Sequence, residues 1–237
     1  MDSIAGTGVD GAASRPATNV DQIEETDMGE ATAETSAADL MVDLIISLDG
    51  YASAEGWPGW WGLEGPEYLG WLEQEGEKGY TFLLGANTYR VMSSMSGEAA
   101  AEGSGFSKDE GAALTGLEAV PKVVFSSTLQ APLTWPNSEL VTGDAVEAVR
   151  EMKRTGTRPL STLGSLSLCR SLLTAGLVDR FRLVVFPVIT GRTGRERIYD
   201  GYPDVALEMV DSRTFDGRLQ LLEYVPTVLN GPPGSPT

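Results

Sequence analysis

The stretch SLDGY at residues 47–51 contains the chain's foremost candidates for proton transfer, Asp49 and Tyr51. Asp49 follows the apolar run LMVDLIIS at residues 40–47, which predicts a strand. A carboxyl group at a strand end can pass a proton to a bound molecule, and Tyr51 is a second titratable group beside it. Asp-Gly is also a common turn sequence, in which the aspartate bonds nearby backbone groups. The sequence leaves both interpretations of Asp49 open.

Two glycine-containing stretches join the end of a strand to the start of a helix. LLGANTY (83–89) offers Gly85, Asn87 and Thr88, and TLGSLSL (162–168) offers Leu163, Gly164, Ser165, Leu166 and Ser167. The first backbone N–H groups of a helix have no partner within the helix, so such turns can bind a phosphate. Each turn can equally be an ordinary helix start with a polar cap.

A third polar turn follows the apolar run PKVVF at residues 121–125. It contains the hydroxyl side chains of Ser126, Ser127 and Thr128, and no lysine or arginine stands beside them in the sequence. These hydroxyls can donate hydrogen bonds to a bound anion. Alternatively, they only satisfy the backbone of the turn.

Tryptophan is concentrated in the stretch that follows Asp49. Three of the five tryptophans, Trp57, Trp60 and Trp61, lie in a segment interrupted by glycine and proline. Aromatic rings provide stacking area for a flat or apolar ligand. The alternative for any one of them is packing against the domain, since tryptophan is usually largely buried.

Composition excludes several classes of function. The net charge of −17 argues against nucleic acid and anionic membranes as partners. The absence of histidine excludes Ser-His-Asp and Cys-His catalysis, and the single Cys169 excludes an internal disulfide. We expect no metal site, because no carboxylate loop of the calcium-binding type is present. The chain shows neither an apolar run long enough to span a bilayer nor a signal-peptide pattern, so we expect a cytoplasmic protein.

Three segments follow from the composition along the chain. Residues 1–39 are acidic and predicted to be a disordered leader, residues 40–228 form one domain, and residues 229–237 form a flexible tail rich in proline and glycine. Strands are predicted at 40–47, 79–85, 121–127, 158–164 and 178–189, and a hairpin at 205–225 across FDGR. Helices are predicted at 65–76, from 86, at 143–156 and at 165–176, with a long loop at 93–117. The alternation predicts a mostly parallel sheet with an antiparallel edge and helices on both faces.

The order of these pieces resembles the dihydrofolate reductase fold. It is more closely similar to the reductase domain of bacterial riboflavin biosynthesis, the RibD C-terminal domain family. The matching stretches are SLDG (47–50), LLGANTY (83–89), PKVVFSSTL (121–129), the block TLGSLSLCRSLLTAGLVDRFRLVVFPVITGRTG (162–194) and GRLQLLEYV (217–225). The resemblance covers about residues 41–228, and the 162–194 block is its most specific part.

The resemblance implies an NAD(P)H-dependent reductase that transfers hydride to a small, planar or apolar unsaturated substrate. It implies that the two glycine turns hold the phosphates of NADPH, or of NADH, and that the Ser126–Thr128 turn contacts the adenosine end. Asp49 and Tyr51 are then the catalytic candidates. Trp57, Trp60, Trp61 and Pro187 are the candidates for substrate binding, and a homodimer is expected from the family.

Two features of the residues refine this expectation. The chain has few cations to bind a ribityl phosphate, so we expect an apolar substrate, such as one of secondary metabolism, in place of the riboflavin intermediate. Relatives often carry arginine directly after the first glycine, where this chain has Ala86. The alternative is therefore the same fold with a decayed cofactor site, acting as a non-redox metabolite-binding or biosynthetic pocket.

The acidic leader generates a first prediction. Deleting residues 2–38 is expected to leave the melting temperature within a few degrees of the full chain, because a disordered segment contributes little packing. Calorimetry or circular dichroism measures the effect. A large drop in the melting temperature would show that the leader docks on the domain or on a partner.

Overall fold

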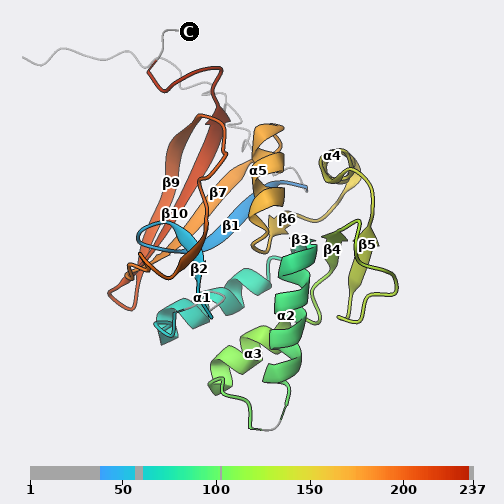
Figure 1. Cartoon of the computed structure of the whole chain (residues 1–237), viewed down its shortest axis with the longest axis vertical. Helices are drawn as coiled ribbons and strands as arrows, with labels where there is room; N and C mark the ends of the chain where they lie inside the picture. Colours follow the sequence, from blue (N-terminus) through green and yellow to red (C-terminus); the bar gives the residue numbers. More distant parts are fainter. Residues whose placement is uncertain (1–37, 57–60, 102, 235–237) are drawn as a thin grey trace, which may run out of the picture. The chain divides into compact units, whose positions relative to one another are not determined.

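The computed structural model describes residues 38–56, 61–101 and 103–234, and Figure 1 shows the arrangement of its elements. The strands are β1 (Leu40–Ser47), β2 (Tyr51–Ala54), β3 (Thr81–Gly85), β4 (Lys122–Phe125), β5 (Ser138–Val141), β6 (Leu160–Thr162), β7 (Arg180–Phe186), β8 (Gly194–Arg197), β9 (Val205–Phe215) and β10 (Leu219–Val228). The helices are α1 (Pro66–Gly76), α2 (Ala86–Ala99), α3 (Lys108–Gly116), α4 (Ala145–Thr155) and α5 (Leu166–Thr174). None of these helices in the described part of the chain is long and apolar enough to cross a bilayer.

Eight strands form one sheet in the order β5-β4-β3-β6-β1-β7-β10-β9. The six strands from β5 to β7 are parallel, and β10 and β9 continue the sheet in antiparallel pairing. The predicted mostly parallel sheet with an antiparallel C-terminal hairpin is confirmed. The chain runs outward from β1 to β5 and then returns to place β6 between β3 and β1. Ligands of such sheets bind at the carboxyl ends of the strands, near a reversal of this kind.

Alternate residues of each strand point to opposite faces, and helices cover both faces. Leu83 of β3 and Leu44 of β1 belong to the main core, which is completed by Val149 of α4 and Leu172 of α5. On the other face, Tyr68 and Trp71 of α1 pack on Val184 and Phe186 of β7. Tyr89 of α2 packs there on Leu84, Val124 and Trp135. Because parallel strands are covered on both faces, they read as continuous apolar runs, which made them visible in the sequence.

The segment from 93 to 117 differs from the predicted long loop. Helix α2 continues to Ala99, and α3 begins at Lys108. Ser107 caps α3 in a capping box: its hydroxyl accepts from the Glu110 N–H, and the Glu110 carboxylate accepts from the Ser107 N–H. The sequence SKDE was therefore a helix-start signal hidden among glycine, serine and alanine. Strands β2, β5 and β8 were also absent from the prediction, because each is a four-residue segment with no fully buried residue and therefore no continuous apolar run.

The hairpin at the C-terminal edge also holds the start of α1. Asp216 and Gly217 have positive φ angles of 52° and 64° and lie at the centre of the turn between β9 and β10, which the Arg218 N–H closes by donating to the Phe215 carbonyl at 2.9 Å. The Asp216 carboxylate accepts from the backbone N–H groups of Glu67 and Tyr68, and the Glu67 carboxylate accepts from the Asp216 N–H. Gly65 is needed here because a Cβ at this position would collide with the Asp216 carboxylate. Helix α1 is thus capped by a residue 149 positions away.

A buried ionic cluster lies between the sheet and α1. The Arg182 guanidinium on β7 donates to Glu75 of α1 at 2.5 Å and to Asp43 of β1 at 2.6 Å. It also lies 4.7 Å from the centre of the Trp71 ring. Arg182 is 3% exposed, so its charge is supported almost entirely by these partners. The cluster fixes the position of α1 on the sheet.

Removal of this cation should be costly. Arg182→Met is expected to lower the free energy of unfolding by roughly 3–5 kcal/mol, because it leaves two carboxylates without their buried partner. Denaturation in urea measures the change. Arg154→Met is the matched control, since Arg154 and Glu151 form an exposed pair on α4 and should change stability by less than about 1 kcal/mol. Equal effects of the two variants would contradict the role given to Arg182.

Candidate functional site

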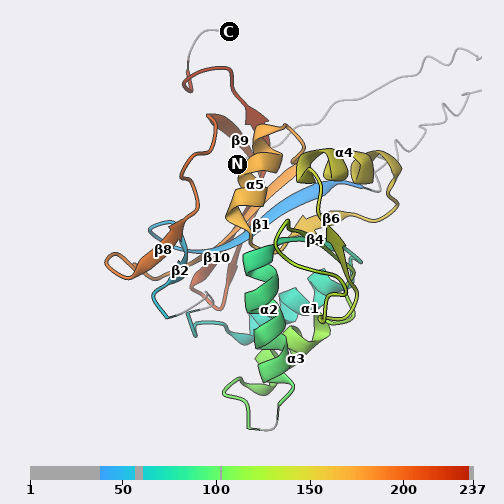
Figure 2. The same ribbon diagram turned by 45° about the vertical axis from the view of Figure 1, so that its right-hand side comes forward.

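The two glycine turns predicted from the sequence lie against each other. Gly85 ends β3, Gly164 follows β6, and these strands are neighbours in the sheet. Figures 1 and 2 show α2 and α5 starting side by side and running away from each other. Gly164 and Ser165 both adopt the left-handed conformation, with φ of 60° and 65°. For Ser165 this conformation is uncommon, and such residues often occur at functional sites.

The hydroxyl of Ser165 joins the two turns. Its oxygen accepts from the Gly85 N–H at 2.7 Å and donates to the Thr88 hydroxyl at 2.8 Å. Gly164 lies next to Thr88, because a Cβ added to Gly164 would meet the Thr88 side chain at 3.5 Å. Below the turn, the buried thiol of Cys169 donates to the Gly164 carbonyl at 3.1 Å. These three hydrogen bonds hold the two turns in a fixed position relative to each other.

Within the described residues, the N–H groups in the first turns of α2 and α5 have no such partner, and no side chain caps either helix. In contrast, Ser107 caps α3, Asp144 caps α4 and Asp216 caps α1. Among the helices of the described residues, the two without a capping side chain are therefore the two that start together. Their free N–H groups and aligned dipoles form an arrangement suited to a phosphate or pyrophosphate.

The Ser126–Thr128 turn lies at the end of β4, the next strand along the edge. The Ser126 hydroxyl accepts from the N–H groups of Thr128 and Leu129, both at 3.0 Å. For Ser126 this agrees with the alternative interpretation, in which the hydroxyl satisfies the backbone of the turn. Ser127 and Thr128 are exposed. The sequence has no cation beside these residues, but the fold brings one to them. Arg90 on α2 donates to the Thr128 hydroxyl at 3.3 Å, and sequence reasoning missed it because it lies 38 positions away.

Asp49 is held firmly at the end of β1. Its carboxylate accepts from the Ser47 hydroxyl at 2.7 Å, from the Gly191 N–H at 2.8 Å and from the Thr190 N–H at 3.1 Å. The Ser47 hydroxyl and these two N–H groups lower the pKa of Asp49 to about 2. A carboxyl group with this pKa is ionised at pH 7. The ionised carboxylate accepts hydrogen bonds from the 188–193 loop and thereby positions it. The predicted acid role of Asp49 stays a prediction.

Tyr51 begins the two-stranded ribbon of β2 and β8 that rises beside Asp49. Its N–H donates to the Ser47 hydroxyl at 3.0 Å, and its ring packs against Gly194, where a Cβ would collide with it. The Arg197 guanidinium lies 5.8 Å from the centre of the ring. Tyr51 therefore links the ribbon to the end of β1, and its catalytic role also stays a prediction.

Apolar side chains surround the ends of β1 and β7. Leu48 is 63% exposed and Ile189 is 75% exposed, and their backbones are joined through the Leu48 N–H to Val188 carbonyl bond of 2.8 Å. The Trp61 ring packs on Phe186 at 5.5 Å between centres, as the alternative of packing on the domain expected. Pro187 lies exposed between Phe186 and Val188. Trp57 and Trp60 lie outside the described residues.

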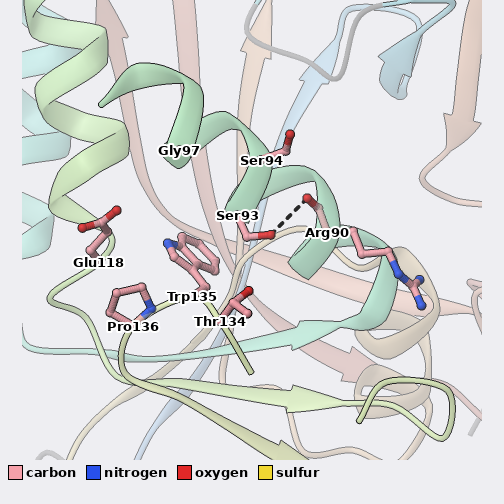
Figure 3. Close-up of a pocket in the computed structure, with 8 residues that line it drawn as sticks. All are labelled: Arg90, Ser93, Ser94, Gly97, Glu118, Thr134, Trp135 and Pro136. Atoms are coloured by element: carbon pink, nitrogen blue, oxygen red, sulfur yellow. Dashed lines mark hydrogen bonds between the residues drawn. The ribbon is translucent and has the colours of Figure 1, made fainter. Parts of the chain in front are cut away.

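The structure also contains a hollow of about 300 Å³ beside α2, shown in Figure 3. Ser93, Ser94 and Gly97 of α2 line it on one side, and Glu118, Thr134, Trp135 and Pro136 line it on the other. Arg90 stands at one end and extends away from Trp135. The hollow thus lies along α2 and not over the two glycine turns, and Arg90, one of its lining residues, also contacts Thr128 after β4. Within the described residues, no cluster of three or more acidic or cysteine side chains suits a metal ion.

Comparison with known proteins agrees with this geometry. The family model of the RibD C-terminal domain matches residues 38–221. An uncharacterised protein of Bacillus subtilis, YyaP, is 30% identical over 84 residues. That match spans 35% of this chain and 44% of the length of YyaP, so it covers less than half of the relative.

Solved structures show the same fold at low sequence identity. A protein of Shewanella sp. PV-4 assigned to riboflavin biosynthesis has a TM-score of 0.59 and 17% identity, over 80% of this chain and 99% of that one. The bifunctional pyrimidine deaminase and uracil reductase of Thermotoga maritima has a TM-score of 0.54 and 15% identity, over 80% and 57%. Dihydrofolate reductase of Enterococcus faecalis, complexed with NADP(H), has a TM-score of 0.50 and 13% identity, over 81% and 97%. The fold is dihydrofolate reductase-like.

The contacts of Asp49 predict a pH-dependent contribution to stability. Asp49→Asn is expected to lower the free energy of unfolding at pH 7 by roughly 1–3 kcal/mol, because the new amide N–H₂ faces backbone donors. The folded-state pKa of about 2 lies below the ordinary value of 3.8, so this stability is present above pH 3.8 and lost as the pH falls toward 2. Urea denaturation measures the difference in the free energy of unfolding between the native protein and Asp49→Asn. This difference should be the same at pH 7 and pH 5 and smaller at pH 3. A difference that persists unchanged at pH 3 would contradict the assignment.

Proposed function

The chain belongs to the RibD C-terminal domain family, and from that premise we propose that it is an NAD(P)H-dependent reductase of a small unsaturated molecule. The observation that carries the proposal is the meeting of two helix starts without capping side chains, joined through Ser165 at the carboxyl edge of the sheet. A dinucleotide places two adjacent phosphates between its halves. Two groups of backbone N–H donors that converge on one point match this double anion.

The residues at these turns fit the cofactor in shape as well as in charge. Glycines at positions 85 and 164 leave the backbone open to close approach, because neither carries a side chain above the turn. A Cβ on Gly85 would already meet the Ser165 hydroxyl at 3.4 Å. The free N–H groups of Ala86, Asn87 and Thr88 on α2, and of Leu166, Ser167 and Leu168 on α5, would bind the phosphates. When bound, the nicotinamide supplies a hydride.

The ends of β1 and β7 would bind the substrate. In the sheet order β1 lies beside β6 and β7 lies beside β1, so their ends continue the same edge away from the phosphate site. Leu48 and Ile189 expose apolar side chains there, and the hydrogen bonds of Asp49 fix the loop that carries Ile189. Apolar contact with these side chains would exclude water from a flat, weakly polar substrate. We therefore propose a planar or apolar substrate.

Asp49 enters this proposal as an ionised group that orients the loop after β7. A proton for the product would then come from water or from the substrate. The acid role predicted from the sequence remains the alternative. Turnover of Asp49→Asn measured across pH separates the two, because loss of an acid removes one limb of the pH profile and costs roughly 10²–10⁴-fold in rate.

Cofactor binding tests the proposal directly. Quenching of tryptophan fluorescence by NADPH and NADH is expected to saturate with the full-length chain. Ala86→Pro removes one free N–H of α2 and retains the helix, since Gly85 has the extended backbone that precedes proline. This variant should raise the cofactor Kd by roughly 10–100-fold, which corresponds to one charge-assisted hydrogen bond of about 1.5–3 kcal/mol.

Ala145→Pro is the matched control. It makes the same change at the first position of α4, where Asp144 is also extended but bonds the next two N–H groups. Cofactor affinity should be unchanged in this variant. If neither nucleotide binds the folded chain at millimolar concentration, the reductase proposal fails and a non-redox pocket on the same fold replaces it.

A further inference from the structure

The hollow beside α2 is a space that the proposed function does not use. Ser93, Ser94 and Gly97 of α2 line one of its walls, because residues three and four positions apart share a face of a helix. A Cβ added to Gly97 would meet no atom within 4 Å, so this wall is open. With a volume of about 300 Å³, the hollow has room for a small molecule.

The wall opposite α2 is held in place by hydrogen bonds and ring packing. The Tyr89 hydroxyl accepts from the N–H groups of Thr134 and Trp135 at 3.0 and 3.1 Å, and the Tyr89 and Trp135 rings pack at 6.2 Å between centres. The Lys122 ammonium lies 4.5 Å from the centre of the Trp135 ring and donates to two backbone carbonyls just after α3, both at 2.6 Å. Trp135 is therefore in position before any ligand binds, which reduces the ordering needed on binding.

Trp135 brings a buried hydrogen-bond donor to the hollow. Its side chain is 4% exposed, and within the described residues its Nε1 atom has no hydrogen-bond partner. In Figure 3 the ring stands between α2 and Pro136, and its nitrogen is on the side that faces Glu118. An indole nitrogen can only donate, and a buried donor without an acceptor is uncommon in folded proteins. A ligand in the hollow should therefore present an oxygen acceptor to this N–H.

Three other polar groups of the hollow offer acceptors. One oxygen of the Glu118 carboxylate accepts from the Ser96 hydroxyl at 3.1 Å, and in the part of the chain that the structure describes this carboxylate forms no ion pair. The hydroxyl protons of Ser93 and Ser94 are used in hydrogen bonds within α2, at 3.1 and 2.9 Å, so their oxygens can accept. The hollow thus combines one donor with several acceptors.

We propose that the hollow is a second ligand site and that it binds a small neutral molecule through a carboxamide group. The amide oxygen accepts from the Trp135 N–H, and the amide N–H₂ donates to the Glu118 carboxylate. A carboxylate ligand would bring a second negative charge toward Glu118, and an ammonium ligand has no acceptor for the Trp135 N–H. A carboxamide supplies both groups on neighbouring atoms. This inference does not depend on the proposed function.

Benzamide is the probe that tests the inference, with benzoate and benzylamine as matched compounds that carry only a carboxylate or only an ammonium group. The five tryptophans of the ¹⁵N-labelled full-length chain should each give one indole N–H signal in a two-dimensional NMR spectrum. Trp135→Phe identifies the Trp135 signal by its loss, and contact with the Tyr89 ring identifies it if that variant does not fold. Benzamide should move this signal saturably, and the other two compounds should bind at least tenfold more weakly.

Substitutions in the walls make the test specific. Gly97→Leu places a side chain on the open wall and retains α2, because leucine is a better helix former than glycine, so it should raise the Kd for benzamide at least tenfold. Gly76→Leu is the matched control, since Gly76 is an exposed glycine of α1 that also has no atom within 4 Å of an added Cβ. The Kd should change less than twofold in this control. Glu118→Gln removes the charge and keeps an acceptor, so it should raise the Kd at least threefold.

Any one of four outcomes would overturn the inference. They are a Trp135 signal that does not move up to the solubility limit of benzamide, equal binding of the three compounds, equal Kd values in Gly97→Leu and Gly76→Leu, and an unchanged Kd in Glu118→Gln. If benzamide moves other indole signals and leaves that of Trp135 in place, the probe binds elsewhere, such as the proposed substrate site, and the hollow is rejected as a ligand site.

Discussion

One hydroxyl group, that of Ser165, holds together the two turns of the proposed cofactor site. It accepts from Gly85 at the end of one strand and donates to Thr88 on the helix that follows. Because Ser165 itself starts α5, these two bonds fix both helix starts relative to each other. The left-handed backbone of Ser165 costs conformational energy, and the two bonds offset that cost. Donors are thereby kept in position before any ligand arrives, which reduces the ordering needed on binding.

The other half of the carboxyl edge, beyond the glycine turns, is held in place by carboxylates that accept hydrogen bonds. Asp49 fixes the loop after β7, and Asp216 caps α1. Further inside the same half, Arg182 fixes α1 to the sheet through Glu75 and Asp43. Acidic side chains thus serve as internal hydrogen-bond acceptors beside the proposed substrate site, whereas the proposed cofactor site presents N–H groups and Arg90. This division of polarity along one edge matches an anionic cofactor beside a weakly polar substrate.

Much of the fold was readable from the sequence, because buried parallel strands leave apolar runs and helix ends leave glycine and polar residues. LMVDLIIS coincides with β1, and FDGR marks the turn of the hairpin. The 93–117 segment was misread, since small residues hid the capping box at Ser107. Arg90 was missed for a different reason: its partner Thr128 is close only through the pairing of β3 with β4. The alternatives for Asp49 also required coordinates, because its partners Thr190 and Gly191 lie on a distant loop.

The cap of α1 has a consequence for how the chain reaches its fold during synthesis. Asp216 is synthesised 149 residues after Glu67, so α1 has no side-chain cap while those residues are being made. At translation rates of roughly 5–20 residues per second, this delay lasts on the order of ten seconds or more. The first turn of α1 is therefore completed only when the C-terminal hairpin has been made.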